Sequence, residues 1–168
     1  MIQPTTAIEP GTLREVCAHF ATGVTVITTG PPGESAGATV NSFTSVSLAP
    51  PLVLFCLHER SRLRPALGRA GGFAVNFLTY EQQPLAWAFA GRESARLQDV
   101  PHHRSGTGLP VLSEALAFLA CRLVTEHDGG DHTIVVGEVV ELGAHHRGQD
   151  PLVFYRGAMR PLEQATPR

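Results

Sequence analysis

The chain has 168 residues, of which 43% are hydrophobic and 17% are charged, and its formal net charge is −2. This composition is typical of a globular protein and excludes a disordered chain. The near-neutral charge gives no electrostatic reason to expect nucleic acid or an acidic membrane surface as a partner. A chain of this length suggests one domain, with a core that needs no metal or disulfide to hold it.

The three cysteines, Cys17, Cys56 and Cys121, are widely spaced and form no C-x-x-C motif. This pattern disfavours a disulfide framework or a zinc site and fits reduced thiols. The first residues lack the cationic patch and apolar stretch of a signal peptide. No apolar run is long enough to span a bilayer. We therefore expect a cytoplasmic protein without a metal site or a membrane partner.

Three short helices are expected. The first begins at a capping box formed by Thr12 and Glu15 and ends at Gly23. The second is capped by Ser61, and the third spans residues 81–90. A loose lead is expected before the first helix, over residues 1–11, and a short tail over 163–168, so the domain spans 12–162.

Strands are expected where β-branched or continuous apolar residues run together. A hairpin turn at residues 128–131 joins the two longest of them, and residues 91–115 are expected to form a long irregular excursion. Because short turns join most neighbours, the pattern predicts a mainly β fold, an antiparallel barrel with peripheral helices, and not a doubly wound parallel sheet. The expected strands are residues 24–29, 35–41, 52–57, 73–78, 116–125, 132–142 and 152–155.

A polar segment at residues 39–47 lies between two apolar strands. Small hydroxyls and an amide supply hydrogen-bond donors without bulk, as a phosphate or the edge of a flavin ring requires. The same residues also suit a polar edge strand with turn-forming residues, so both interpretations stand. The polar residues are Thr39, Asn41, Ser42, Thr44, Ser45 and Ser47.

Ser61 and Arg62 lie at an expected helix start. A helix N-terminus presents free amides and the positive end of the helix dipole, which favour an anion, and Arg62 could add a charged contact. The alternative is an ordinary helix cap with solvated arginines.

His132 follows the hairpin turn and could hydrogen-bond a cofactor or substrate, or donate a proton. The alternative is a purely structural hydrogen bond.

Near the C-terminus, the segment from Tyr155 to Arg160 combines an aromatic ring, a glycine and two arginines, which could hold a planar anionic ligand. The alternative there is a terminal strand with solvated charges.

Three well-known motifs do not occur in the sequence. These are the G-x-G-x-x-G of a Rossmann dinucleotide site, the P-loop, and the G-x-S-x-G of a hydrolase nucleophile elbow. The sequence therefore offers no Rossmann site for a nicotinamide cofactor.

Seven short motifs, spread over about residues 12–160, together resemble the flavin reductase-like family. The family fold is a homodimeric, FMN-binding split β-barrel with a Greek-key course. The motifs are FATGVTV (20–26), NSFTSVS (41–47), PPLV (50–53), FAVN (73–76), GDH (130–132), GEV (137–139) and YRG (155–157).

The resemblance implies reduction of FMN, or FAD, by NADH or NADPH, with the reduced flavin passed to a separate monooxygenase. It implies that His132 lies on the nicotinamide side, that Ser61 and Arg62 lie on the phosphate side, and that the chain forms a homodimer. The remaining residues implied near the flavin are Thr39, Asn41, Ser42, Ser47, Cys56, Leu57, Phe89, Ala90, Gly91, Tyr155 and Arg160.

Hydride transfer between two cofactors needs no acid or metal from the protein, which must only stack and align the two rings. The leading hypothesis is therefore an NAD(P)H:flavin oxidoreductase. Two alternatives stay open from the sequence: a flavin-binding or carrier module without reductase activity, and a reductase that acts on a ferric or corrin acceptor.

Overall fold

The computed structural model describes residues 8–92, 95–145 and 148–162. The expected tail and the first seven residues of the expected lead lie outside these ranges. Within them, no helix is both long and apolar enough to cross a bilayer.

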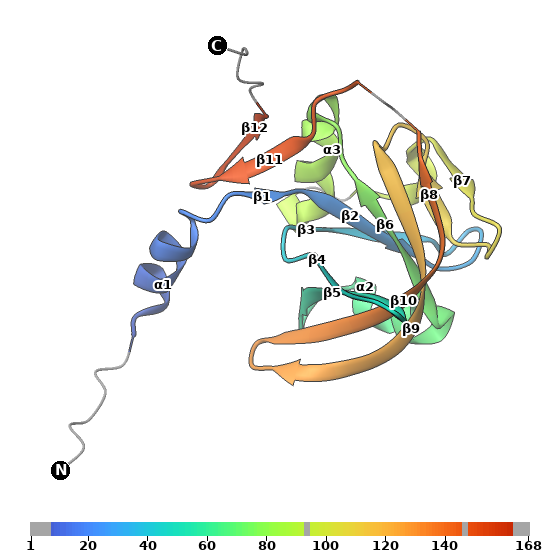
Figure 1. Ribbon diagram of the computed structural model, residues 1–168, viewed down its shortest axis with the longest axis horizontal. Helices are drawn as coiled ribbons and strands as arrows, with labels where there is room; N and C mark the ends of the chain where they lie inside the picture. Colours follow the sequence, from blue (N-terminus) through green and yellow to red (C-terminus); the bar gives the residue numbers. More distant parts are fainter. Residues whose placement is uncertain (1–7, 93–94, 146–147, 163–168) are drawn as a thin grey trace.

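A seven-stranded antiparallel sheet forms the body of the protein, in the order β3-β2-β6-β9-β10-β5-β4 (Figure 1). Its edges, β3 and β4, are joined only by residues 41–43. Because so short a segment spans only about 10 Å, the sheet must curl back on itself as an open barrel. The predicted mainly β, antiparallel fold is confirmed. The strands are β2 (Thr25–Thr29), β3 (Ala36–Val40), β4 (Thr44–Leu48), β5 (Pro51–His58), β6 (Gly72–Phe77), β9 (Ala117–Gly129) and β10 (His132–Ala144).

The main core lies inside the barrel. Alternate residues of β5 point into it, and Phe55 meets Phe73 edge to face with ring centroids 5.0 Å apart. Gly137 on β10 makes room for this pair, because an added Cβ there would lie 2.4 Å from the Phe73 ring. The short helix α2 (Leu63–Ala70) buries Leu63 and Leu67 in the same core. Helix α2 therefore has a fixed position beside the end of β5.

A buried amide joins the barrel to a two-stranded hairpin, β7 (His102–Arg104) and β8 (Pro110–Leu112). Asn76 on β6 donates to the Val26 carbonyl at 2.9 Å and to the Thr28 hydroxyl at 3.0 Å. Its side-chain oxygen accepts from the Leu112 amide at 2.8 Å. The expected excursion at residues 91–115 therefore contains ordered structure, which also includes η3 (Leu97–Asp99).

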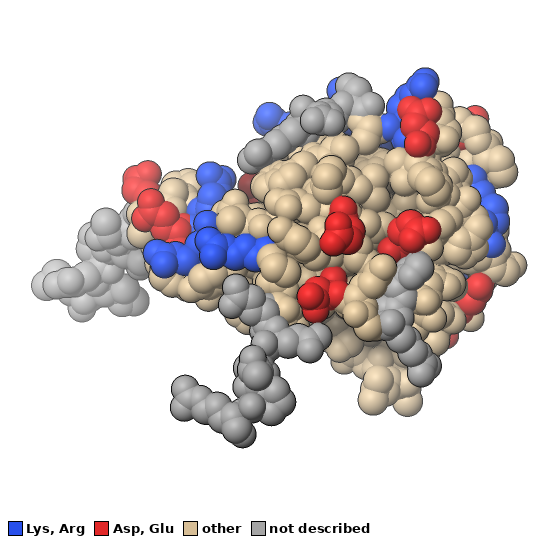
Figure 2. Space-filling view, turned by 90° about the horizontal axis from the view of Figure 1, so that it is seen from above, with Lys and Arg blue, Asp and Glu red and all other residues tan. Residues whose placement is uncertain are grey.

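An arm extends from the barrel (Figure 1). It consists of α1 (Pro10–Cys17) and a three-stranded sheet of β1 (Thr22–Gly23), β11 (Leu152–Tyr155) and β12 (Ala158–Pro161). Helix α1 buries none of its residues. In Figure 2, basic and acidic side chains both lie at this end, whereas the middle of the visible face shows separate acidic spots and much uncharged surface.

The boundaries of two expected helices are wrong. Helix α1 begins at Pro10, whose fixed backbone angle favours the first helical turn, so Thr12 lies inside the helix and forms no cap. The helix ends before Gly23, which belongs to β1. The helix expected at 81–90 is broken into η1 (Tyr80–Gln82), α3 (Gln83–Trp87) and a wide turn, η2 (Ala88–Arg92), where Gly91 adopts a φ of 84°.

Candidate functional site

A cleft of about 740 Å³ opens where β3, the end of β5, the start of α2 and η2 converge. Its volume is in the range of small-molecule and cofactor sites. Most of the residues singled out from the sequence line it, although they come from distant parts of the chain. These are Thr39, Asn41, Ser42, Cys56, Leu57, Ser61, Arg62, Phe89, Ala90, Gly91 and His132.

Three of the predicted site residues do not line this cleft within one chain. Ser47 lies on the edge strand β4, opposite Leu52. Tyr155 and Arg160 lie on the β11–β12 hairpin of the arm. These strands do not border the cleft in one chain, and the order of residues in the sequence did not indicate this separation.

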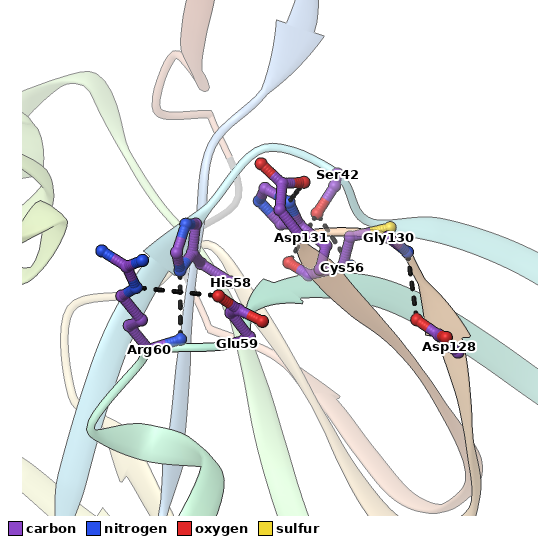
Figure 3. A network of polar contacts seen from close by, with 9 residues as sticks. Ser42, Cys56, His58, Glu59, Arg60, Asp128, Gly130 and Asp131 are labelled. Carbon is purple, nitrogen blue, oxygen red and sulfur yellow. Dashed lines mark hydrogen bonds and ion pairs between the residues drawn. The ribbon is translucent and has the colours of Figure 1, made fainter.

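Two hydroxyls of the polar segment form internal hydrogen bonds. The Ser42 Oγ accepts from the Cys56 amide at 2.9 Å and donates to the Cys56 carbonyl at 3.1 Å (Figure 3). The Thr39 hydroxyl donates to the Ala86 carbonyl at 2.7 Å. Both hydroxyls therefore fix the walls of the cleft, and their protons are not free for a ligand. Among the described residues, no protein group pairs with the exposed amide of Asn41, which remains available.

One wall is formed by close contact between Phe89 and Gly37. The Phe89 ring is 7% exposed, and a Cβ added at Gly37 would lie 3.0 Å from it. Only glycine allows the ring to lie against the backbone of β3 here. The chain then turns at Gly91, whose left-handed backbone a side chain would strain.

The start of α2 forms the basic end of the cleft. The Ser61 hydroxyl accepts from the Leu63 amide at 3.3 Å, but Arg62 is the residue in the N-cap position, so the predicted cap at Ser61 is displaced by one residue. Within the described ranges, the exposed Arg62 has no ion-pair partner, whereas Arg60 lies 3.6 Å from Glu59. The amides of Ser61, Leu63 and Arg64 are used within the protein, so the Arg62 guanidinium and the positive end of the helix dipole are what favour an anionic group here.

His132 also lines the cleft, at the start of β10 and beside His58 at the end of β5. The His132 Nδ1 is 2.7 Å from the Asp131 Oδ1. The hydrogen bond and the charge of His132 lower the pKa of Asp131. The carboxylate is therefore ionised and accepts a hydrogen bond from the Nδ1–H of His132. The Nε2 of His132 remains as its second polar atom. A smaller hollow of about 310 Å³ lies beyond His132, towards the hairpin tip.

Several lining residues were not predicted from the sequence. The largest are His58 and Arg60, at the end of β5. His58 lies directly opposite His132 in the β5–β10 ladder, so only the strand register could have indicated it. Within the described part of the chain, no group of three or more potential metal-ligating side chains comes together.

Residues 17–163 match the family model described as "Flavin reductase like domain". The chain belongs to the flavin reductase-like family. Over 157 residues the chain is 41% identical to the "Flavin-dependent monooxygenase, reductase subunit HsaB" of Rhodococcus jostii (strain RHA1). This match covers 94% of this chain and 80% of that relative.

A second flavin reductase-like relative is the "FMN reductase (NADH) SmoA" of Agrobacterium fabrum (strain C58 / ATCC 33970), which is 44% identical over 86% of this chain and 82% of its own. Among solved structures, the "Streptomyces globisporus C-1027 NADH:FAD oxidoreductase SgcE6 in complex with NAD and FAD fragments" superposes with a TM-score of 0.84 at 35% identity, and covers 95% of this chain and 98% of that one.

Proposed function

We propose that this protein is an NADH-dependent flavin reductase that reduces FMN, or FAD, and supplies the reduced flavin to a partner monooxygenase. The observation that carries this proposal is the cleft of about 740 Å³, which brings Asn41, Arg62 and His132 to one cavity of cofactor size. Family membership and the names of the two relatives support the same reaction.

The residues of the cleft fit a flavin mononucleotide. The Arg62 guanidinium, at the positive end of the α2 dipole, would hold the phosphate. The wall made by Phe89 and Gly37 is apolar, which suits the face of a ring system, and the free Asn41 amide could bond a polar ring edge. The end of β5 at Cys56 would run beside the ring. The bound flavin supplies the redox chemistry, so the chain must only bind and orient the reactants.

His132 would act on the nicotinamide side. Because Nδ1 donates to Asp131, the neutral imidazole presents an Nε2 lone pair, which can accept a hydrogen bond from a carboxamide N–H. This role needs no proton transfer from the ring during hydride transfer. The same Asp131 carboxylate keeps the imidazole in this tautomer.

The protein would act as a homodimer. Large apolar side chains are exposed on the arm, where Leu13, Val16 and Phe20 are 54%, 65% and 77% exposed. Further exposed apolar residues lie on β4 and on the β9–β10 ribbon. Exposed apolar patches of this kind mark interfaces, and a second copy of the chain is the partner proposed for them. Any flavin contact made by Tyr155 or Arg160 would then be to the cleft of the second copy.

We also place the protein in the cytoplasm. None of its three cysteines forms a disulfide, and Cys121 is buried, which raises the pKa of its thiol to about 12 and keeps it unreactive. Free cysteines fit a reducing compartment.

The direct test is a turnover assay of NADH and NADPH, each with FMN, FAD or no flavin. The proposal expects NADH oxidation that depends on added flavin and that proceeds faster than with NADPH. A protein that binds flavin but does not accelerate its reduction by NADH under anaerobic conditions would instead be a flavin carrier.

A further inference from the structure

His58 and His132 face each other across the ladder of β5 and β10, where they are paired in register. Their ring centroids are 5.1 Å apart and the ring planes meet at 74°, an edge-to-face arrangement. Both side chains line the cleft. Aromatic rings in this arrangement attract each other beyond the effect of burying their surface.

Each ring is held by a different hydrogen bond. The Arg60 amide donates to the His58 Nδ1 at 3.1 Å, so the neutral His58 ring carries its proton on Nε2 (Figure 3). His132 has the opposite arrangement, because its Nδ1 donates to Asp131. The two imidazoles therefore occupy complementary tautomers. The proton-bearing Nε2 of His58 and the lone pair on the His132 Nε2 are the atoms without a partner among the described residues.

The support beneath this pair is rigid. The Glu59 amide donates to the Asp131 carbonyl at 3.0 Å, which joins the turn after β5 to the turn before β10. The contact with Asp131 alone leaves His132 weakly held, since its side chain is 42% exposed and that of Asp131 is 76% exposed. Water competes for such an exposed bond. The His58 ring provides the second contact that limits rotation of His132.

We propose that His58 is a positioning residue for His132: its ring fixes the orientation in which the His132 Nε2 meets the nicotinamide. This inference rests on the proposed role of His132 in the reductase reaction. Arg60, Glu59 and Asp131 are the charged groups around the pair, and they hold the backbone and the tautomers while the ring contact sets the angle.

Two substitutions separate the ring contact from the hydrogen bond. His58→Phe keeps an aromatic ring beside His132 but removes the acceptor for the Arg60 amide. His58→Asn keeps an acceptor near the position of Nδ1 but removes the ring. If the ring positions His132, His58→Asn lowers kcat/KM for NADH by about 2- to 10-fold, whereas His58→Phe stays within about 2-fold of the wild type.

A double-mutant cycle tests whether His58 acts through His132. In a His132→Ala background, His58→Asn should cause less than about a 2-fold further loss. His127→Ala serves as the matched control, because His127 is an exposed histidine on β9 that does not line the cleft, and it should leave the rate unchanged.

The other possible results contradict either the role of His58 or that of His132. Additive losses, or a His58→Phe variant as impaired as His58→Asn, would overturn the positioning role while leaving that of His132 intact. If His132→Ala itself turns over NADH at the wild-type rate, the proposed role of His132 is wrong, and the inference about His58 falls with it.

Discussion

The hydroxyl of Ser42 lies between the amide and the carbonyl of Cys56, accepting a hydrogen bond from the first at 2.9 Å and donating one to the second at 3.1 Å. This contact ties the segment between the two edge strands to the strand that forms the opposite wall of the cleft. The polar segment thus has two functions: part of it builds the cleft, and part of it faces the ligand.

Ser42→Ala should loosen this connection. Because two hydrogen bonds to backbone are lost, we expect a fall in the free energy of unfolding of about 1–2 kcal/mol and a several-fold higher KM for FMN. Chemical denaturation and steady-state kinetics measure the two effects. Ser45→Ala is the control, since the exposed Ser45 side chain bonds no other group in the described part of the chain. Equal effects of the two substitutions would contradict the role given to Ser42.

Gly37→Ala should displace Phe89. A Cβ at 3.0 Å from the ring forces it to move, so we expect FMN to bind about 10-fold more weakly, with a stability loss of about 1–3 kcal/mol. Gly68→Ala is the matched control on α2, where nothing lies within 4 Å of the new Cβ. There alanine should stabilise the protein by up to about 1 kcal/mol. Unchanged FMN binding in Gly37→Ala would show that this wall is not part of the flavin site.

Arg62→Ala should weaken binding of FMN but not of riboflavin, which lacks the phosphate. The expected loss is about 10-fold for FMN at low salt and smaller at high salt, because a charge-assisted contact with the phosphate is removed. Fluorescence titration with both flavins measures it. Arg69→Ala, in the last turn of the same helix, should affect neither flavin. A similar loss with riboflavin would place the phosphate elsewhere.

Asp131→Asn should remove a stabilising contact that depends on pH. The pKa of Asp131 is lowered by the hydrogen bond and charge of His132, so its contribution is present above the ordinary value of 3.8 and is lost as pH falls through the lower folded value. The Tm difference between wild type and Asp131→Asn should therefore be fully present above about pH 4 and shrink below it. Thermal melts across this range test it, and a difference that grows on acidification would contradict it.

Val16→Asp should weaken the dimer. The side chain is 65% exposed on α1 and lies on the arm, so the substitution costs the single chain little but places a charge in the proposed interface. Sedimentation velocity should show a shift towards monomer at a given protein concentration. An unchanged sedimentation coefficient would place the interface elsewhere or leave the protein monomeric.

The sequence predicted the barrel strands well where β-branched residues run together, as in β2, and where an apolar run is bounded by prolines and charges, as in β5. It offered β4 only as one of two interpretations, a polar edge strand, because its residues, TSVSL, are mostly exposed and carry no buried face. Helix α1 was expected from the sequence, but the described part of the chain buries none of its residues. Periodicity shows which face is apolar and not what covers it.

In the candidate site, too, the sequence predicted which residues lie there but not what their side chains contact. Most of the residues that the resemblance implied near the flavin line one cleft. The hydrogen-bond partners of their side chains could not be predicted from the sequence. The Thr39 hydroxyl is used within the protein because α3 lies against β3. His58 meets His132 because of a strand register that no local pattern encodes.

The central claim is that this cleft is where NADH reduces a flavin. Its most direct test is anaerobic mixing of the protein with FMN and NADH, followed by the visible absorbance of the flavin, with the wild type and His132→Ala side by side. We expect rapid loss of the oxidised-flavin absorbance with the wild type and a rate at least about 10-fold lower with His132→Ala. Oxidised flavin that persists with the wild-type protein at the rate of the protein-free control would contradict it.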